Sequence, residues 1–367
     1  MSATAPRVPI NDLGRALTEE SAEITAALSR VLASGWLVHG PEHTAFESEL
    51  AAYLGAGRVL GVASGTDALE IALRAVTDPA RPVVVTAANC GGYTTTAARR
   101  AGLTPRYADV DPETHLLTAA TVEPVLDERV GTVVVTHLYG RAADVAPLRE
   151  LCAARGIRLL EDCAQSAGAR TGEGMAGALA DVATFSFYPT KNLGAIGDGG
   201  AIATSDPAVA ERVARLRQYG WSGKYQIAED GGRNSRLDEL QAAVLRTRLA
   251  RLDAGNARRR AIVAHYAERA SERVHVLPAD GDGHVGHLAV LTTPDRDALR
   301  EHLAADGIGH DVHYPVPDHH QPAFAAEYAG TVLPVTERLA AEVLSVPCFP
   351  ELTDDEVARV GDALARF

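Results

Sequence analysis

One position in the chain carries a side chain that could do covalent chemistry, and it follows a strand-like apolar run. Lys191 lies in the loop YPTKNLG, directly after the run 182–187. A lysine held partly out of water can lose its proton and attack a carbonyl, which arginine cannot do. The chain has 35 basic residues, of which only Lys191 and Lys224 are lysines. A lysine in an arginine-rich chain favours a chemical role over a surface position.

Asp162 follows the apolar run 157–160, within the motif EDCAQ. A carboxylate at the carboxyl end of a strand can hold a protonated ring nitrogen and make that ring an electron sink, although it could also cap the next helix. The turn 64–67 (SGTD) follows the run 59–62 and opens a helix. Free N–H groups there would suit a phosphate, and an ordinary capped helix would look the same.

The order of these features along the chain is more informative than any one of them. A phosphate cradle, a carboxylate and a lysine come at successive strand ends, and in open α/β sheets ligands bind at the carboxyl ends of strands. The loop after Lys191 does not have the GxGxxG spacing of a dinucleotide-binding turn, and the chain has no GxxxxGK[ST] loop. We therefore predict a pyridoxal-phosphate enzyme of fold type I that carries its cofactor on Lys191 as a Schiff base.

The elements that must position these residues alternate along the first part of the chain. Runs that are apolar on both faces are typical of parallel strands covered by helices, and such alternation predicts a doubly wound α/β domain. We expect strands at 59–62, 82–85, 130–135, 157–160, 182–187 and 201–204, with helices at 67–76 and 145–155.

The pattern changes after Gly232. The stretch 236–270 is Arg-rich and helical, and we expect a break near Gly255. A strand at 287–291 and helices at 297–305 and 354–366 should follow. We divide the chain into a large cofactor-binding domain with an N-terminal arm, residues 1–250, and a smaller C-terminal α/β domain, residues 251–367.

Composition narrows the class of protein further. The net charge is −13, with 46% hydrophobic and 23% charged residues, which disfavours non-specific nucleic-acid or anionic-membrane binding. There is no apolar segment of signal or transmembrane length and no CxxC pair, so we expect a cytoplasmic protein. The His-rich run 310–320 could bind a metal, but its two prolines do not place two ligands on one helical face. We expect no metal there and favour a substrate-contacting or structural loop.

Several longer motifs resemble one family. The chain is similar nearly end to end to the DegT/DnrJ/EryC1/StrS aminotransferases, the sugar aminotransferases of antibiotic and cell-surface sugar pathways. The resemblance implies an aspartate-aminotransferase-like (fold type I) large domain with a mostly parallel sheet, plus the smaller C-terminal α/β domain. The matching segments are 35–37 (GWL), 64–69 (SGTDAL), 137–140 (HLYG), 161–165 (EDCAQ), 185–194 (FSFYPTKNLG), 234–243 (NSRLDELQAA) and 313–315 (HYP).

The resemblance also implies roles for individual residues. Lys191 would hold the cofactor and move the proton, Asp162 would pair with the pyridinium nitrogen, and Gln165 would bond the ring hydroxyl. Further implied contacts are Gly65, Thr66 and Ser186 to the phosphate, Asn234 to the phosphate of a neighbouring subunit in a homodimer, and Trp36, His313, Tyr314 and His319 to the substrate.

The chain departs from the family in the segment 89–94 (NCGGYT). Members often stack an aromatic side chain on the cofactor ring here, and that position falls on Gly91. Either Tyr93 stacks in its place or Cys90 contacts the ring edge. A second departure, Cys163 in place of alanine, should be neutral.

The activity implied is transfer of an amino group from L-glutamate to a keto group of a nucleotide-linked deoxysugar, with dTDP as the expected nucleotide. The segments 8–13 and 344–347 resemble 3-keto-sugar members more than 4-keto ones. A 4-keto-sugar, cyclitol or aminobenzoate-type aminotransferase and a non-catalytic regulatory protein are the alternatives. A sugar 3-dehydratase is disfavoured, because those relatives replace the lysine with histidine and Lys191 is present.

Overall fold

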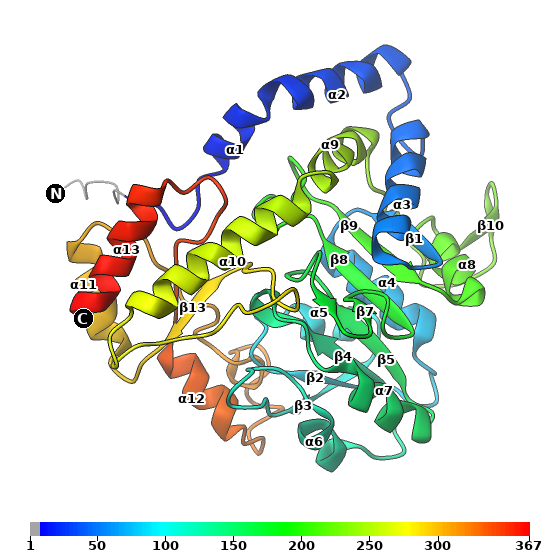
Figure 1. The fold of residues 1–367 in the computed structure, drawn as a ribbon. Helices are drawn as coiled ribbons and strands as arrows, with labels where there is room; N and C mark the ends of the chain where they lie inside the picture. The colour runs from blue at the N-terminus through cyan, green and yellow to red at the C-terminus, as the bar shows by residue number, and fades with distance from the viewer. Residues whose placement is uncertain (1–7) are drawn as a thin grey trace.

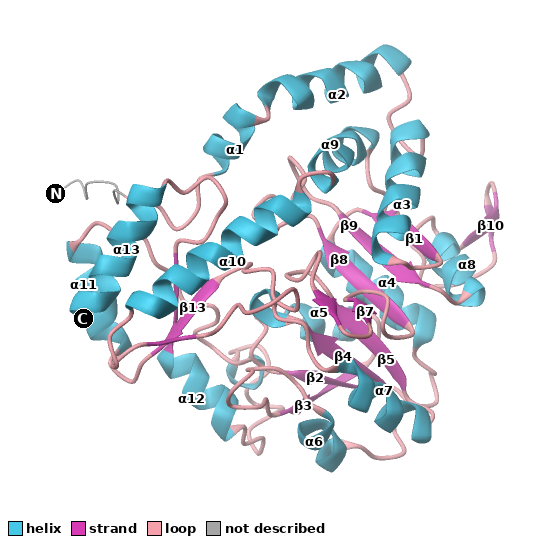
Figure 2. Ribbon diagram, viewed as in Figure 1, coloured by secondary structure: helices cyan, strands magenta, loops and turns pink. Residues whose placement is uncertain are grey.

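The central element is a seven-stranded sheet in the computed structural model, which describes residues 8–367. Figure 1 shows its strands running through the middle of the larger part of the molecule, and Figure 2 shows helices on both sides. Only β9 runs antiparallel to its neighbours, which confirms a mostly parallel α/β fold. In sheet order the strands are β1 (Arg58–Val62), β9 (Gly200–Thr204), β8 (Val182–Ser186), β5 (Arg158–Asp162), β4 (Val130–Thr136), β2 (Val83–Ala87) and β3 (Thr104–Ala108).

The antiparallel direction of β9 has a local cause. The segment 187–199 between β8 and β9 contains no crossover helix, and a parallel neighbour would require one. The chain therefore turns back beside the strand that it has just left. The turn itself contains Lys191, so the exception to the parallel pattern is also the loop with the reactive lysine.

The two faces of the sheet are covered by different helices. One face packs against α4 (Gly65–Val76), α5 (Tyr93–Arg100) and α8 (Pro207–Leu216). The other packs against α3 (Pro41–Leu54), α6 (Ala119–Val122), α7 (Val145–Ala154) and the short η1 (Glu123–Val125).

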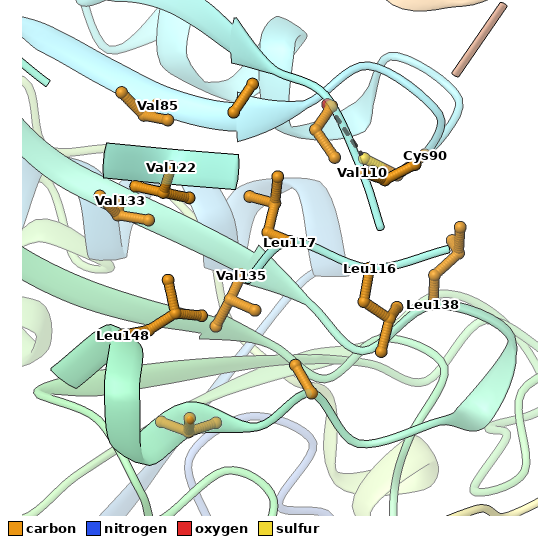
Figure 3. Packing of buried hydrophobic residues seen from close by; sticks show 14 of the residues in the cluster. Val85, Cys90, Val110, Leu116, Leu117, Val122, Val133, Val135, Leu138 and Leu148 are labelled. Atoms are coloured by element: carbon orange, nitrogen blue, oxygen red, sulfur yellow. Dashed lines mark hydrogen bonds between the residues drawn. The ribbon is translucent and has the colours of Figure 1, made fainter. Parts of the chain in front are cut away.

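Successive side chains of a strand point to opposite faces of the sheet, and in β5 this alternation continues to the residues of the candidate site. Along β5, Leu159 packs on the α7 side and Leu160 on the α4 side. Figure 3 shows the α7 side, with Val133, Val135 and Leu148 in one cluster. Glu161 and Asp162 continue the alternation, so their carboxylates lie on opposite faces.

The helical stretch at 236–270 is broken, as expected, but the break does not lie near Gly255. It is divided into α9 (Glu239–Leu249) and α10 (Leu252–Arg269), and the break falls at 250–251, whereas Gly255 lies inside α10. In the last turn of α9, Arg248 donates to the carbonyls of Gly194 (2.7 Å) and Ala195 (3.2 Å) in the loop after Lys191. These bonds join the end of α9 to the loop that contains the lysine.

The C-terminal part is built on a three-stranded antiparallel sheet of β12 (His275–Val276), β13 (Ala289–Thr292) and β14 (Val343–Val346). The expected strand at 287–291 begins two residues later. Helix α11 (Arg296–Ala305) begins one residue before the expected start, and α13 (Asp354–Arg366) begins where expected, after the capping box of Thr353. Helix α12 (Pro334–Glu342) and η3 (Asp318–His320) lie between β13 and β14 along the chain.

The N-terminal arm contains α1 (Leu13–Glu19) and α2 (Ser21–Ser34), and α2 packs against α9. Its beginning contacts the C-terminal part, because Val8 pairs with Ile308 and lies in the same hydrophobic cluster. Residues 1–7 of the proposed large domain lie outside the described residues, and the division at residue 250 stays a prediction. In the described range no helix is long and apolar enough to cross a membrane. The remaining elements are η2 (Leu138–Gly140) and the hairpins β6–β7 (Arg170–Thr171, Gly174–Met175) and β10–β11 (Trp221–Gly223, Gln226–Ile227).

Candidate active site

A cavity of about 790 Å³ lies at the carboxyl ends of β4, β5 and β8. Loops from the C-terminal part complete its wall through His287, His313 and Tyr314. Nine of the residues expected in the site line this cavity: Gly65, Thr66, Tyr93, Asp162, Gln165, Ser186, Lys191, His313 and Tyr314. The structure therefore gathers the phosphate cradle, the carboxylate and the lysine at one place.

Lys191 lies on the loop that follows β8, where its backbone N–H donates to the carbonyl of Tyr188 at 2.8 Å. Burial lowers the pKa of Lys191 to about 8, against the opposing effect of the Asp162 carboxylate. An amine with this pKa is partly neutral near neutral pH, and only the neutral form attacks a carbonyl. Lys191 is therefore set up for covalent attachment of an aldehyde.

Asp162 ends β5 and is buried. Its Oδ1 accepts a hydrogen bond from the N–H of Ala164 at 3.1 Å. Burial raises the pKa of Asp162, although the Ala164 N–H and the charges of Lys191 and His137 oppose this effect. A buried carboxylate with a raised pKa is stabilised by a cationic N–H partner. The protonated pyridine nitrogen of pyridoxal phosphate fits that need.

The neighbouring carboxylate, Glu161, lies on the other face and is fully engaged within the protein. It accepts hydrogen bonds from His137 Nε2 (3.0 Å) and from the N–H groups of Gly177 (2.9 Å), Leu179 (2.8 Å) and Ala180 (3.0 Å). Burial alone would raise the pKa of Glu161, but the bonds from His137 and the backbone outweigh it and lower that pKa. Glu161 is thus a structural anion that fixes the end of β5.

Gln165 presents a donor to the cavity. Its Oε1 accepts from the N–H of Tyr139 at 2.7 Å, which orients the amide so that Nε2 points away and donates to the Tyr314 hydroxyl at 3.1 Å. An amide N–H directed into the cavity is suited to bond the oxygen on the cofactor ring. The hydroxyl of Tyr139 also donates to the carbonyl of His313 at 2.6 Å and anchors the loop that carries Tyr314.

The phosphate cradle is the first turn of α4. The Ser64 side chain caps this helix by accepting from the N–H of Asp67 at 3.1 Å. Gly65 and Thr66, in the first turn, line the cavity beside Ser186. A Cβ at Gly65 would lie 2.6 Å from the Cβ of Ser186, so glycine is needed for this close approach. A helix N-terminus with a neighbouring hydroxyl fits a phosphate.

Three expected site residues do not line the cavity. Trp36 is 58% exposed and donates to the carbonyl of Val38 at 2.8 Å. Asn234 is exposed, next to its backbone partner Gln218. His319 is buried and bonds Glu337 at 3.2 Å. The ring of His319 therefore packs inside the fold in this structure, and its contact with substrate stays a prediction. Within one chain, Trp36 and Asn234 likewise lack a position at the site.

Sequence reasoning missed His287, which lines the cavity at the start of the C-terminal sheet. Its Nδ1 bonds Asn192 Oδ1 at 2.8 Å, and Asn192 in turn donates to Asn256 (2.7 Å) and to the carbonyl of Val285 (3.0 Å). Burial and the proximity of Lys191 and Arg259 lower the pKa of His287 well below its usual value, so the ring stays neutral. Its sequence neighbourhood offers no local signal, because it reaches the site only through packing of the two parts.

A lysine with a lowered pKa, a buried carboxylate and a helix N-terminus share one cavity on a mostly parallel α/β sheet, and this combination fits a pyridoxal-phosphate enzyme. Comparisons with known proteins agree. The model of the DegT/DnrJ/EryC1/StrS aminotransferase family matches residues 18–365. The chain belongs to this family and is a pyridoxal-phosphate-dependent aminotransferase.

Similar proteins include a dTDP-3-amino-3,4,6-trideoxy-alpha-D-glucose transaminase of Streptomyces venezuelae, 43% identical, with 100% of this chain and 97% of that protein covered. The erythromycin biosynthesis sensory transduction protein EryC1 of Saccharopolyspora erythraea is 42% identical, with 96% and 97% covered. The crystal structure of S. venezuelae DesV in complex with a ketimine intermediate has a TM-score of 0.95 at 42% identity, covering 99% of this chain and 98% of that chain.

Proposed function

We propose that this aminotransferase moves an amino group from L-glutamate to the 3-keto group of a dTDP-linked deoxysugar, in the biosynthesis of an amino sugar for an antibiotic. The observation that carries this proposal is the shared cavity of Lys191 and Asp162 in a chain whose full length matches a dTDP-3-amino-sugar transaminase at 43% identity. The same match favours a 3-keto over a 4-keto sugar and over a cyclitol.

The chemistry divides between the cofactor and the protein. When bound, pyridoxal phosphate supplies a ring that withdraws electrons from the amino-bearing carbon. Asp162 would hold the ring N–H and keep it charged, and the first turn of α4 would hold the phosphate. Lys191 Nζ would take a proton from the amino-bearing carbon of the substrate and return one to the carbon on the other side of the amino nitrogen. Gln165 orients the ring by donating to its hydroxyl oxygen.

We further propose that the enzyme works as a cytoplasmic homodimer in which Asn234 of each subunit reaches the phosphate site of the other. Asn234 is exposed and does not line the cavity of its own chain, as a residue used by a partner should be. Apolar side chains are also exposed on the N-terminal arm and the segment after it, which an association would cover. They are Leu13, Leu17, Leu32, Trp36, Leu37 and Val38.

The experiment is a pair of half-reactions followed by visible absorbance. The purified enzyme with pyridoxal phosphate should show the band of the lysine-linked cofactor, and L-glutamate should remove it. A dTDP-3-keto-deoxysugar should then restore the band, whereas the 4-keto isomer should not. Lys191→Ala should bind the cofactor without this covalent link and lose turnover, and Lys224→Arg serves as the matched lysine control for covalent attachment. Restoration by the 4-keto sugar alone would contradict the proposed substrate.

A further inference from the structure

One wall of the cavity is formed by two tyrosines from distant parts of the chain. Tyr93 begins α5, and Tyr314 lies in the loop between α11 and η3. Their rings meet edge to face, with centroids 6.3 Å apart and planes at 76°. Both line the cavity that holds Asp162 and Lys191. The edge-to-face contact restrains both rings, and the pair presents an aromatic surface to the cavity.

Gly91 lies directly behind this pair, and its lack of a side chain is what makes the arrangement possible. A Cβ at position 91 would lie 2.9 Å from Tyr314 Cε1 and 3.0 Å from Tyr93 Cε2. Both values are well below ordinary van der Waals contact. The rings therefore occupy the space into which a side chain at 91 would point.

Tyr314 is the more firmly held of the two rings. Its hydroxyl accepts from Gln165 Nε2 at 3.1 Å, and the preceding carbonyl, of His313, accepts from Tyr139 at 2.6 Å. Tyr93 is 52% exposed, whereas Tyr314 is half-buried. Under the proposed function Gln165 would bond the ring oxygen of the cofactor, so its bond to Tyr314 would place that tyrosine beside the ring.

The two loops that carry the tyrosines are also tied to each other. The N–H of Asp318 donates to the carbonyl of Ala88 at 2.8 Å, and its carboxylate accepts from the Thr95 hydroxyl. These bonds join the loop before α5, and α5 itself, to η3, which follows the loop of Tyr314. Asp318 is completely buried. The tyrosine pair is thus a preformed wall.

Besides the two tyrosines and the histidines His287 and His313, the aromatic residues Phe185 and Tyr188 line the cavity, but neither of these two offers a fixed face. The ring of Phe185 packs in the core, where it fills the space beside Gly177. Tyr188 is 53% exposed. We propose that Tyr314 covers one face of the cofactor ring, that Tyr93 supports it edge-on, and that Gly91 is a positioning residue required to admit it. This inference rests on the proposed cofactor chemistry of the site.

Cofactor affinity tests the proposal independently of turnover. Apoenzyme is titrated with pyridoxal phosphate, and visible absorbance and circular dichroism are recorded. Tyr314→Leu should weaken binding about 10-fold, because the aromatic contact is lost, and should change the visible dichroism. Tyr314→Phe keeps the ring and should stay within about 3-fold of wild type.

Gly91 and Gly92 provide a matched pair of variants. Both have a positive φ, 78° and 79°, so alanine strains the backbone equally at either position. A Cβ at Gly92 meets nothing within 4 Å. Gly91→Ala should therefore weaken cofactor binding several-fold more than Gly92→Ala. In a protein that already carries Tyr314→Leu, Gly91→Ala should weaken cofactor binding no more than Gly92→Ala does. The ring that the alanine methyl group at position 91 would displace is then absent.

The possible outcomes distinguish a failure of this inference from a failure of the proposed function. If wild-type protein takes up no pyridoxal phosphate, the proposed function and this inference both fail. If wild type binds the cofactor, but Tyr314→Leu binds it equally well with unchanged dichroism, only the inference is overturned. If alanine at positions 91 and 92 weakens cofactor binding equally, Gly91 has no special role in positioning Tyr314. Should Gly91→Ala not fold, the two Tyr314 variants still decide the question.

Discussion

At the residue scale, the chemistry of the site depends on two groups whose pKa values are shifted in opposite directions for a single reason. Burial lowers the pKa of Lys191 to about 8 and raises that of Asp162. In both cases burial disfavours the charged form. A free Lys191 amine is thereby available for attack, and Asp162 gains most from a cationic ring nitrogen.

The first prediction concerns the pH dependence of cofactor attachment. Because only the neutral amine attacks, the rate of covalent attachment to apoenzyme should rise with pH and level off above about 8, the pKa of Lys191. An unshifted lysine would level off only above about 10. Stopped-flow absorbance after mixing with pyridoxal phosphate measures this rate. A rate that keeps rising up to pH 10 would show that Lys191 is not perturbed.

The second prediction separates Asp162 from other carboxylates of the cavity. Asp162→Asn preserves the shape and removes the charge, so the cofactor should still bind while turnover falls by about 100-fold or more, as when a stabilising electrostatic partner is removed from an active site. Asp198 lines the same cavity and is exposed. Asp198→Asn should change turnover far less. Equal losses in the two variants would mean that general cavity charge, not the pairing with the ring, is what matters.

At the element scale, strand alternation and helix ends place the reactive groups. Alternation at the end of β5 directs Glu161 into a closed set of hydrogen bonds and Asp162 into the cavity. The turn between β8 and β9 contains Lys191, and the end of α9 is bonded to the same loop through Arg248. Side-chain bonds also join the N-terminal arm to the C-terminal part of the molecule.

The third prediction tests that junction. Arg15 after the start of α1 forms a two-pronged ion pair with Glu356 of α13, at 2.6 and 2.7 Å. The bond from Arg15, with smaller contributions from Thr353, lowers the pKa of Glu356 to about 2. Because the folded pKa is depressed, this stabilisation is complete above the unfolded value of about 4.5 and is lost as pH falls toward 2.

Glu356→Gln should therefore lower the free energy of unfolding by about 1 kcal/mol at pH 7, since the pair is partly exposed. The difference from wild type should shrink between pH 4.5 and 2. Asp355→Asn, in the same helical turn, serves as control. Urea denaturation at several pH values measures both. A deficit that does not change with pH would assign the effect to helix capping instead of the ion pair.

At the scale of the whole molecule, the site is complete only when several distant segments come together. Strand ends of the large sheet and loops of the C-terminal part together line this cavity. The chain alone leaves Asn234 outside this cavity, which is the basis for the proposed exchange between subunits. A mixed dimer of two different inactive variants can test whether Asn234 acts in the site of the partner subunit.

The fourth prediction is therefore a complementation experiment. Lys191→Ala and Asn234→Ala homodimers should each have low activity. In a mixed dimer, one of the two sites would combine an intact Lys191 with an intact partner Asn234. Mixing the variants under exchange conditions should thus restore activity to about a quarter of wild type at random pairing. No recovery, despite subunit exchange verified by mass spectrometry, would place Asn234 outside the partner's site.

Much of the fold class and of the candidate site could be predicted from the sequence alone. Lys191, Asp162 and the turn before α4 are local motifs, and their types and order already imply the cofactor chemistry and the α/β class, because backbone turns and strand ends are encoded by neighbouring residues. Packing between distant segments decided the rest. It brought His287 and Tyr314 into the cavity and buried His319 against Glu337. The direction of a side chain depends on what packs around it, and those partners lie far away in the sequence.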